Sequence, residues 1–249
     1  MADQLLELPA NACAGHFPGR PIVPGALQLV LIEEALAAAT GESGLAVVGI
    51  GRVRFRTTIG PNAVLALRKE LVDRRARFTL RADGETASEG SLTLGHLPAA
   101  AGGELEGTMV AGLPAAEACL PHVPPMRLVR GVTELGEDGG TCVGQVDDDC
   151  QLVRAGKVPA VATVELAAQA LAMLEAARAG AEVTTAEGYL VGVSSAVVHA
   201  SSVAVGAPLL ATVRRSAWMP PLAQAEASVH SGGQLVLETR LTAWLARAS

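Results

Sequence analysis

One short stretch of the chain places a histidine among an unusual density of prolines and glycines. Residues 15–28 read Gly-His-Phe-Pro-Gly-Arg-Pro-Ile-Val-Pro-Gly-Ala-Leu-Gln. Proline and glycine at this density disfavour regular structure, so the stretch is predicted to form a stiff loop. His16 on such a loop offers an imidazole that can act as a general base near neutral pH.

The end of this loop is predicted to start a helix. Pro24 can begin a helix but cannot continue one, which makes it a supporting residue of the turn. Gly25 leaves its backbone N–H open to a ligand at the positive end of the helix. If His16 acts as the base and the Gly25 N–H polarises a thioester carbonyl, the two groups together can remove a proton from the carbon next to that carbonyl.

The second half of the chain contributes a carboxylate in an apolar setting. Residues 164–170 read Val-Glu-Leu-Ala-Ala-Gln-Ala. A carboxylate in the middle of an apolar helix is costly unless it is paired. Glu165 is therefore predicted to be functional, with Gln169 one turn later in a supporting role.

Similar elements would position these groups in both halves. A helix is predicted from Pro24 to about Ala39 with Gly41 as its stop, and a second from about Pro159 to Arg178 with Gly180 at its end. Alternating runs separated by turns predict antiparallel strands. These runs are 46–50, 53–58, 63–71, 76–82 and 91–97 in the first half, and 128–135, 141–146, 189–193, 196–199, 209–215, 223–230 and 235–244 in the second.

Both helices are apolar nearly all round, which is typical of a buried helix. A long buried helix wrapped by an antiparallel sheet, occurring twice, predicts an α+β double hotdog fold that forms a pseudodimer. The boundaries are an N-terminal domain at 1–97, a linker at 98–117 where periodicity is lost, and a C-terminal domain at 118–249.

The composition narrows the functional class. The 249 residues are 50% hydrophobic and 18% charged, with a net charge of −6 and a pI of about 5.4. Scattered basic residues and few aromatics argue against nucleic-acid binding. The N-terminus lacks the basic region of a signal peptide, and we find no apolar run of about 20 residues, so we expect a cytoplasmic protein outside the membrane. The four cysteines show no metal-binding spacing, and we expect no metal.

The loop at 15–28 closely resembles the His-Phe-Pro-Gly-x-Pro-x-x-Pro-Gly-x-Leu signature of the beta-hydroxyacyl-[acyl-carrier-protein] dehydratases, the FabZ/FabA family. The resemblance implies that His16 is catalytic and that the Gly25 N–H binds the thioester carbonyl. That family places a Glu or Asp fourteen positions after the histidine, where this chain has Val30. Glu33 and Glu34 lie about one turn further on, and Glu34 stays open as a substitute carboxylate.

The second half resembles the same family in a complementary way. Glu165 and Gln169 match the family's helix pattern Glu-Ala-Met-Ala-Gln, while Gln151 stands where the histidine would be. The stretch Leu-Pro-His-Val-Pro-Pro-Met at 120–126 resembles the family's opening motif. Its histidine, His122, is expected to anchor a loop and is not the matched catalytic histidine.

The first half thus lacks the family's carboxylate and the second half lacks its histidine. Together they predict one intact composite active site, made of His16 and Glu165, and one inactive site, made of Gln151 and Val30. More narrowly, the first half resembles the ApeI-type dehydratase subunit of aryl polyene clusters and the second half the ApeP-type subunit. The chain would then be a fusion of a heterodimeric pair.

The resemblance implies a lyase that converts (3R)-hydroxyacyl chains to trans-2-enoyl thioesters in fatty acid or (aryl) polyene biosynthesis. The substrate would be carried as a thioester on the phosphopantetheine of an acyl carrier protein, with no other cofactor. Arg20 is the first candidate for carrier-protein docking, ahead of Arg127 and Arg154, because an acidic carrier needs a basic contact. Pseudodimers could assemble further into homo-oligomers. A hotdog acyl thioesterase and a non-catalytic carrier-protein binding module remain alternatives.

Overall fold

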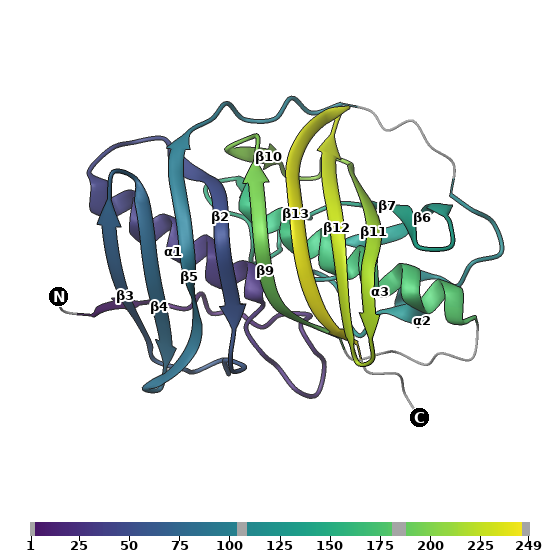
Figure 1. Cartoon of the computed structure of the whole chain (residues 1–249), viewed down its shortest axis with the longest axis horizontal. Helices are drawn as coiled ribbons and strands as arrows, with labels where there is room; N and C mark the ends of the chain where they lie inside the picture. The colour runs from purple at the N-terminus through teal and green to yellow at the C-terminus, as the bar shows by residue number, and fades with distance from the viewer. Residues whose placement is uncertain (1–2, 104–108, 181–187, 246–249) are drawn as a thin grey trace.

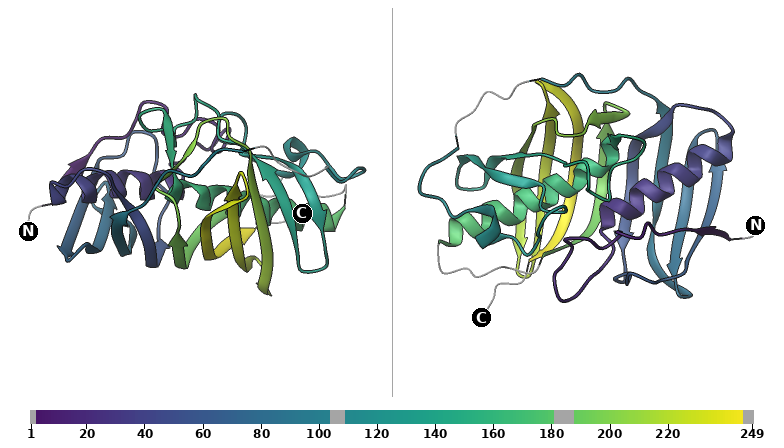
Figure 2. Two further views of the ribbon diagram at one scale, coloured as in Figure 1. Left: turned by 90° about the horizontal axis from the view of Figure 1, so that it is seen from above. Right: turned by 180° about the vertical axis from the view of Figure 1, so that it is seen from behind.

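The computed structural model describes residues 3–103, 109–180 and 188–245. In this part of the chain, eleven strands form one antiparallel sheet, and two long helices lie end to end across the same face of that sheet (Figures 1 and 2). The strand order is β1-β3-β4-β5-β2-β9-β13-β12-β11-β7-β6. The order shows that each half of the sequence builds one half of the sheet.

The first half contributes five strands and the helix α1 (Gly25–Thr40). α1 is buried along most of its length, and it ends at Gly41, whose φ of 71° lies in the left-handed region that favours glycine. The predicted helix and its stop are thus confirmed. The strands are β1 (Gln4–Leu6), β2 (Leu45–Phe55), β3 (Leu65–Val72), β4 (Arg75–Ala82) and β5 (Glu85–His96).

The second half repeats this plan with more strands. Its central helix α3 (Val164–Ala179) follows a 3-10 turn at Ala160–Thr163 and ends at Gly180. A short helix α2 (Ala116–Cys119) precedes the first strand, and β8 (Lys157–Pro159) pairs with β10 (Ser202–Ala204) apart from the main sheet. The main strands are β6 (Val129–Leu135), β7 (Gly139–Gly144), β9 (Gly188–Val198), β11 (Leu209–Met219), β12 (Leu222–Ser231) and β13 (Gln234–Leu245). Two helices, each wrapped by its own half-sheet, make the α+β double hotdog fold predicted from the sequence.

The two half-sheets join where β2 pairs with β9 in antiparallel register. Val53 pairs with Val193, and Gly49 pairs with Val197. A Cβ at Gly192 would lie 2.7 Å from the carbonyl oxygen of Val53, so this position in the junction requires glycine. The junction runs through the middle of the sheet and brings the N-terminal ends of α1 and α3 close together (Figure 2).

Two predicted strand breaks are absent from the structure. The run expected at 46–50 and the first half of that at 53–58 belong to the single strand β2, which ends at Phe55. The run at 189–193 and all but the last residue of that at 196–199 belong to β9. Register shifts between Val47 and Gly49 and between Ile50 and Arg52 interrupt the alternation of β2 without ending it. Bulges of this kind reverse which face a side chain occupies, and periodicity then suggests a break.

The apolar character of the second helix exceeds the prediction. Ala160–Ala179 is long and apolar enough, by length and composition alone, to cross a membrane, although the sequence analysis expected no such run. In this structure 89% of the apolar 18-residue window within this stretch is buried inside the protein. It packs as the core helix of its half-sheet.

The predicted linker at 98–117 follows β5, and residues 104–108 of it lie outside the described residues. Its first part lies against the second half: the Ala100 N–H donates to Ser202 O (2.8 Å) and the Ser201 N–H to Pro98 O (2.8 Å). The last residues of the stretch already belong to α2. The division of the chain into domains at these boundaries stays a prediction.

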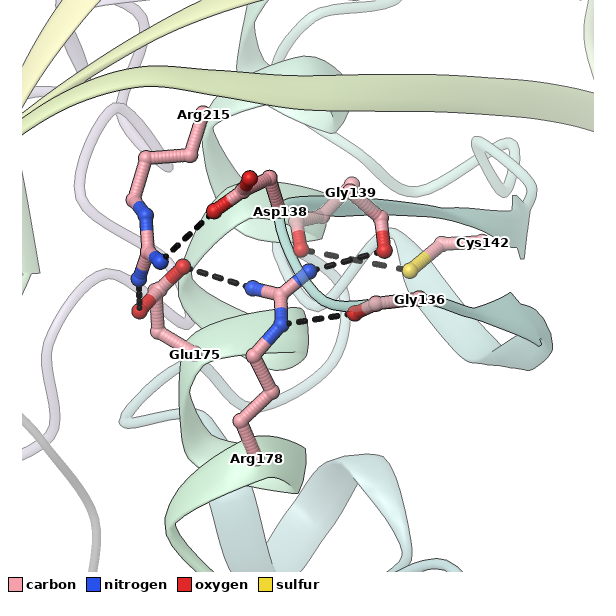
Figure 3. A network of polar contacts seen from close by, with 8 residues as sticks. Gly136, Asp138, Gly139, Cys142, Glu175, Arg178 and Arg215 are labelled. Atoms are coloured by element: carbon pink, nitrogen blue, oxygen red, sulfur yellow. Dashed lines mark hydrogen bonds and ion pairs between the residues drawn. The ribbon is translucent and has the colours of Figure 1, made fainter.

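The C-terminal end of α3 is fixed by a network of polar contacts (Figure 3). Arg178 donates to Gly136 O (3.0 Å) and Gly139 O (2.8 Å) in the β6–β7 hairpin, and to Glu175 (2.6 Å). Glu175 also accepts from Arg215 of β11 (2.8 Å). Arginine side chains at the last turn complement the negative end of the helix. The network anchors α3 at the end opposite to Glu165.

Candidate active site

The loop that carries His16 is held against the second half of the chain. Gly15 has a φ of 71°, and a Cβ at this position would lie 2.2 Å from Val123 O. The Val123 N–H in turn donates to Gly15 O (3.0 Å). Because only glycine allows this close approach, Gly15 sets the position of His16 relative to the segment around Val123.

A single hydrogen bond fixes the tautomer of His16. Its Nδ1 lies 3.0 Å from the carbonyl oxygen of Ile22, which can only accept, so Nδ1 carries the proton and Nε2 is left as the free base. Burial lowers the pKa of His16 to about 4, although the nearby Glu165 carboxylate raises it. The imidazole is therefore neutral at neutral pH and ready to accept a proton.

Glu165 lies in the first turn of α3 and is buried. Gln169 donates from Nε2 to Glu165 Oε1 (3.0 Å) and to Met126 O (2.8 Å), and its Oε1 accepts from the Leu128 N–H (2.9 Å). Burial would raise the pKa of Glu165, but the hydrogen bonds from His122 and Gln169 hold it below its usual value. Gln169 orients an ionised carboxylate, in line with its predicted supporting role.

The structure adds His122, whose expected role from the sequence was only to anchor a loop. Its Nε2 lies 3.4 Å from Glu165 Oε1, and its ring centroid lies 5.1 Å from that of His16. The Gly15–Val123 contact explains this position, because it brings the two histidine segments together across the halves. The signal in the sequence was the family-like opening motif at 120–126, which holds a histidine without showing what that histidine faces.

These side chains surround one cavity of about 380 Å³. His16, His122 and Glu165 line it, together with Gly25 and Gln28 from the start of α1. The remaining wall is mainly apolar and comes from β2, α3 and the strands around β9, with Phe55, Ala168, Ala172, Tyr189, Leu190, Leu222 and Trp244 among its residues. A largely apolar cavity with a few convergent polar groups is typical of a small-molecule site.

Gly25 lies at the N-terminal end of α1, as the sequence predicted. The first intrahelical hydrogen bond runs from the Gln28 N–H to Pro24 O (3.2 Å), so the N–H groups before it have no partner within the helix. The ring of Phe55 lies 3.0 Å from where a Cβ of Gly25 would be. The cavity therefore reaches an open helix N-terminus at Gly25, which suits an oxyanion.

Gln151 and Val30 stand where the family pattern would place a second catalytic pair, but in this structure they make structural contacts. Gln151 donates from Nε2 to Ala14 O (2.9 Å) and Ala12 O (3.5 Å), in the segment just before His16. Val30 is fully buried in the hydrophobic core. Neither residue lines the described cavity.

The alternative carboxylates lie away from the site. Glu34 is exposed and forms an ion pair with Arg154 (2.9 Å). Glu33 is buried and accepts from the Val47 N–H (2.6 Å), and burial raises its pKa to about 7. Since neither lines the cavity, the geometry favours Glu165 as the partner of His16.

Arg20 is exposed beside the cavity, and its Nη1 donates to the hydroxyl of Tyr189 (3.4 Å). Arg154 already bonds Gln151 O (2.7 Å) and Val153 O (2.8 Å) in addition to Glu34. Among the candidates for carrier docking, Arg20 therefore has the more suitable position, and Arg154 serves the structure.

His16, His122 and Glu165 have ligand-type atoms that all lie within 4.8 Å of one another. Two imidazoles and a carboxylate are donors that transition metals accept. The same three groups also form a complete acid–base cluster through the His122–Glu165 contact. The absence of a metal stays a prediction.

Comparison with known proteins identifies related families for both halves of the chain. Residues 114–247 match the family model described as ApeP-like, ApeP dehydratase, and residues 4–91 match the one described as ApeI-like, ApeI dehydratase. A 3-hydroxyacyl-[acyl-carrier-protein] dehydratase FabZ from Anaplasma phagocytophilum is 39% identical over 84 residues, which is 27% of this chain and 55% of that protein. The chain covers 55%, 64% and 60% of the length of three such relatives.

Solved structures show the same fold at low sequence identity. The dehydratase domain of RzxB from Pseudomonas fluorescens is 16% identical with a TM-score of 0.70, over 97% of this chain and 92% of that one. A candidate thioesterase from Novosphingobium aromaticivorans is also 16% identical, with a TM-score of 0.57 over 97% and 98% of the two chains. The fold alone is shared by both activities. Because the ApeP-like model covers more than half of the sequence and the ApeI-like model most of the remainder, the chain belongs to the ApeP-like dehydratase family and carries an ApeI-like half in front of it.

Proposed function

We propose that this protein dehydrates (3R)-hydroxyacyl thioesters to trans-2-enoyl thioesters at one composite site. The observation that carries the proposal is the meeting of His16 from the first half and Glu165 from the second at one cavity, with ligand-type atoms within 4.8 Å. The corresponding pair, Gln151 and Val30, contains no acid or base. The chain would thus keep one of the two sites that a symmetric pair would have.

The reaction removes a proton from C2 and a hydroxyl from C3. The free Nε2 of His16 accepts the C2 proton, because its Nδ1 is held by Ile22 O. The N–H of Gly25 faces the thioester oxygen, where negative charge develops as the proton leaves. Glu165 faces the C3 hydroxyl and assists its departure as water. General acid–base groups of this kind typically contribute about 10²–10⁴-fold each to the rate.

The wall of the cavity supports a substrate with a flat, conjugated acyl chain, such as an (aryl) polyene. The chain has only three Phe, two Trp and one Tyr, yet Phe55, Tyr189 and Trp244 line this cavity. The Tyr189 and Trp244 rings lie 5.5 Å apart, and Phe17 packs edge-on against Tyr189 at 5.4 Å. Aromatic walls favour stacking with planar groups. A plain fatty acyl chain would also fit an apolar wall, so competition between the two substrates tests this preference.

An acyl carrier protein would deliver the substrate on its phosphopantetheine arm, so that no other cofactor is needed. Arg20 supports this because it is exposed beside the cavity. Arg20→Glu is expected to raise KM for the carrier-bound substrate much more than for a free pantetheine thioester. Equal effects on both would argue against a docking role.

The experiment is a dehydration assay with a 3-hydroxyacyl thioester, in which mass spectrometry detects the loss of water. Wild type is compared with His16→Ala, Glu165→Gln and Glu34→Gln, where Glu34 serves as the matched surface control. Loss of activity in the first two variants alone supports the composite site. Release of free acid would instead indicate a thioesterase, and binding without turnover would indicate a carrier-binding module.

A further inference from the structure

His122 lies where it can take part in the reaction. Its side chain is buried, lines the cavity and lies 3.4 Å from Glu165 Oε1. The rings of Phe17 and His16 flank it at 4.9 and 5.1 Å. A histidine with only a loop-anchoring role would not need to face the carboxylate and the cavity together.

The contact with Glu165 defines which nitrogen of His122 donates a proton. The ionised carboxylate of Glu165 can only accept, so the imidazole donates to it from Nε2. The other nitrogen, Nδ1, is buried with no hydrogen-bond partner among the described residues. A buried polar atom without a partner is costly, and folded proteins contain few of them. The proton on Nε2 therefore lies on the side of the carboxylate.

The chemistry of dehydration requires such a proton. The C3 hydroxyl leaves readily only as water, which means that one proton must be added to its oxygen. Glu165 is ionised in the resting site, where hydrogen bonds from His122 and Gln169 favour its charged form. It can pass a proton on, but it needs a neighbour from which to receive one.

We propose that His122 is this neighbour and that it supplies, through Glu165, the proton that converts the departing hydroxyl to water. This step rests on the proposed dehydratase function. The C2–H bond breaks and its proton goes to Nε2 of His16, while the bonding electrons form the C2–C3 double bond. His122 starts the cycle as an imidazolium paired with the Glu165 carboxylate and transfers its Nε2 proton to Glu165. The C3–O bond then breaks with its electron pair on oxygen, which takes that proton from Glu165, so that Glu165 is again ionised and His122 is left neutral.

The cycle closes within the same cluster. After water and product leave, His16 holds one extra proton and His122 lacks one, so the net charge is unchanged. Transfer from His16 through Glu165 to His122 restores the resting state, and all three groups lie within 4.8 Å of one another. Cys150 also interacts electrostatically with Glu165. Burial raises the pKa of its thiol to about 11, so the thiol stays protonated. His122 acts through Glu165 and is thus a positioning and proton-supplying residue.

The test compares two leaving groups on the same enzyme. A 3-hydroxyacyl pantetheine thioester needs a proton on its leaving group, whereas the matching 3-chloroacyl thioester loses chloride and needs none. The variants are His122→Gln, which keeps an N–H donor for Glu165 but cannot cycle a proton, His16→Ala, and the surface control His199→Gln. Rates are corrected for spontaneous chloride loss.

We expect His122→Gln to lose about 10²-fold or more in kcat with the hydroxyl substrate, as is typical for an acid–base group, and to eliminate chloride at a rate near that of wild type. His16→Ala should lose both reactions. If His122→Gln loses both reactions equally, the role of His122 is structural and the proposal is overturned. If it loses neither, His122 supplies no proton, and the proposal is overturned as well. A wild type that dehydrates no hydroxyacyl thioester would instead refute the proposed function itself.

Discussion

The side-chain amide of Gln151 donates a 2.9 Å hydrogen bond to the carbonyl oxygen of Ala14, two residues before His16. The position that would hold the second catalytic histidine thus braces the loop of the first. Gln151 is buried, and its contact crosses from the second half of the chain to the first.

Replacing this brace should weaken the active site without removing any reacting group. For Gln151→Ala we expect a loss of about 1–3 kcal/mol in the free energy of unfolding, because the carbonyls of Ala12 and Ala14 lose their donor. Activity should fall moderately, since His16 keeps its bond to Ile22. Urea unfolding and kcat measured together check this, with Gln145→Ala as a partly buried comparison. Unchanged stability would contradict a bracing role.

A methyl group at the start of α1 should close the site. In Gly25→Ala the new Cβ would lie 3.0–3.3 Å from three ring atoms of Phe55, so the ring or the helix N-terminus must shift. We expect a marked fall in kcat/KM at little cost in stability. The double variant Gly25→Ala with Phe55→Leu should recover part of the activity. If Gly25→Ala alone is fully active, the substrate does not need the close approach to the backbone that only glycine allows here.

The buried neutral imidazole of His16 should make stability depend on pH. Its pKa is lowered from 6.5 to about 4 in the folded protein, so the unfolded chain binds more protons between these values. Stability is then fully present above pH 6.5 and is lost as the pH falls towards 4, by about 3 kcal/mol at most. The free energy of unfolding of His16→Phe should vary less across this window than that of wild type. An identical pH dependence in both proteins would refute the prediction.

Gln28 should be a position where substrate binding and stability oppose each other. Its Oε1 is buried at the cavity without a hydrogen-bond partner among the described residues. Gln28→Leu should therefore leave the protein as stable as wild type or raise its free energy of unfolding by about 1 kcal/mol. KM should rise, because the substrate loses a polar contact. Thermal unfolding and steady-state kinetics on one preparation separate the two effects.

Removal of metal ions should leave the enzyme active. The cluster of His16, His122 and Glu165 is arranged for proton transfer, with the His122–Glu165 contact of 3.4 Å at its centre. Dialysis against a strong chelator is expected to leave kcat unchanged, and elemental analysis should find no bound transition metal in stoichiometric amount. Activity that is lost and then regained with added zinc would require a different mechanism.

Much of the fold followed from periodicity, but contacts between the halves did not. The helices, their glycine stops and most strands of the main sheet follow from local patterns, as at Gly41 and Gly180. The order of the strands in the sheet was not predicted. The continuous strand β2 was predicted as two, because its bulges reverse the alternation locally. His122 was assigned to a loop because its meeting with Glu165 depends on the packing of Gly15 against Val123 across 108 positions of sequence. Local patterns carry no information about such a contact.

The junction between β2 and β9 has a consequence for how this protein can change. In a symmetric homodimer every substitution at the interface occurs twice, once on each side of the two-fold axis. Here Val53 and Val193 pair across the junction but are encoded separately. Each side can therefore vary alone and be compensated by the other. In a single covalent chain, both natural variation and protein engineering can therefore produce asymmetric interfaces that are not accessible to a symmetric homodimer.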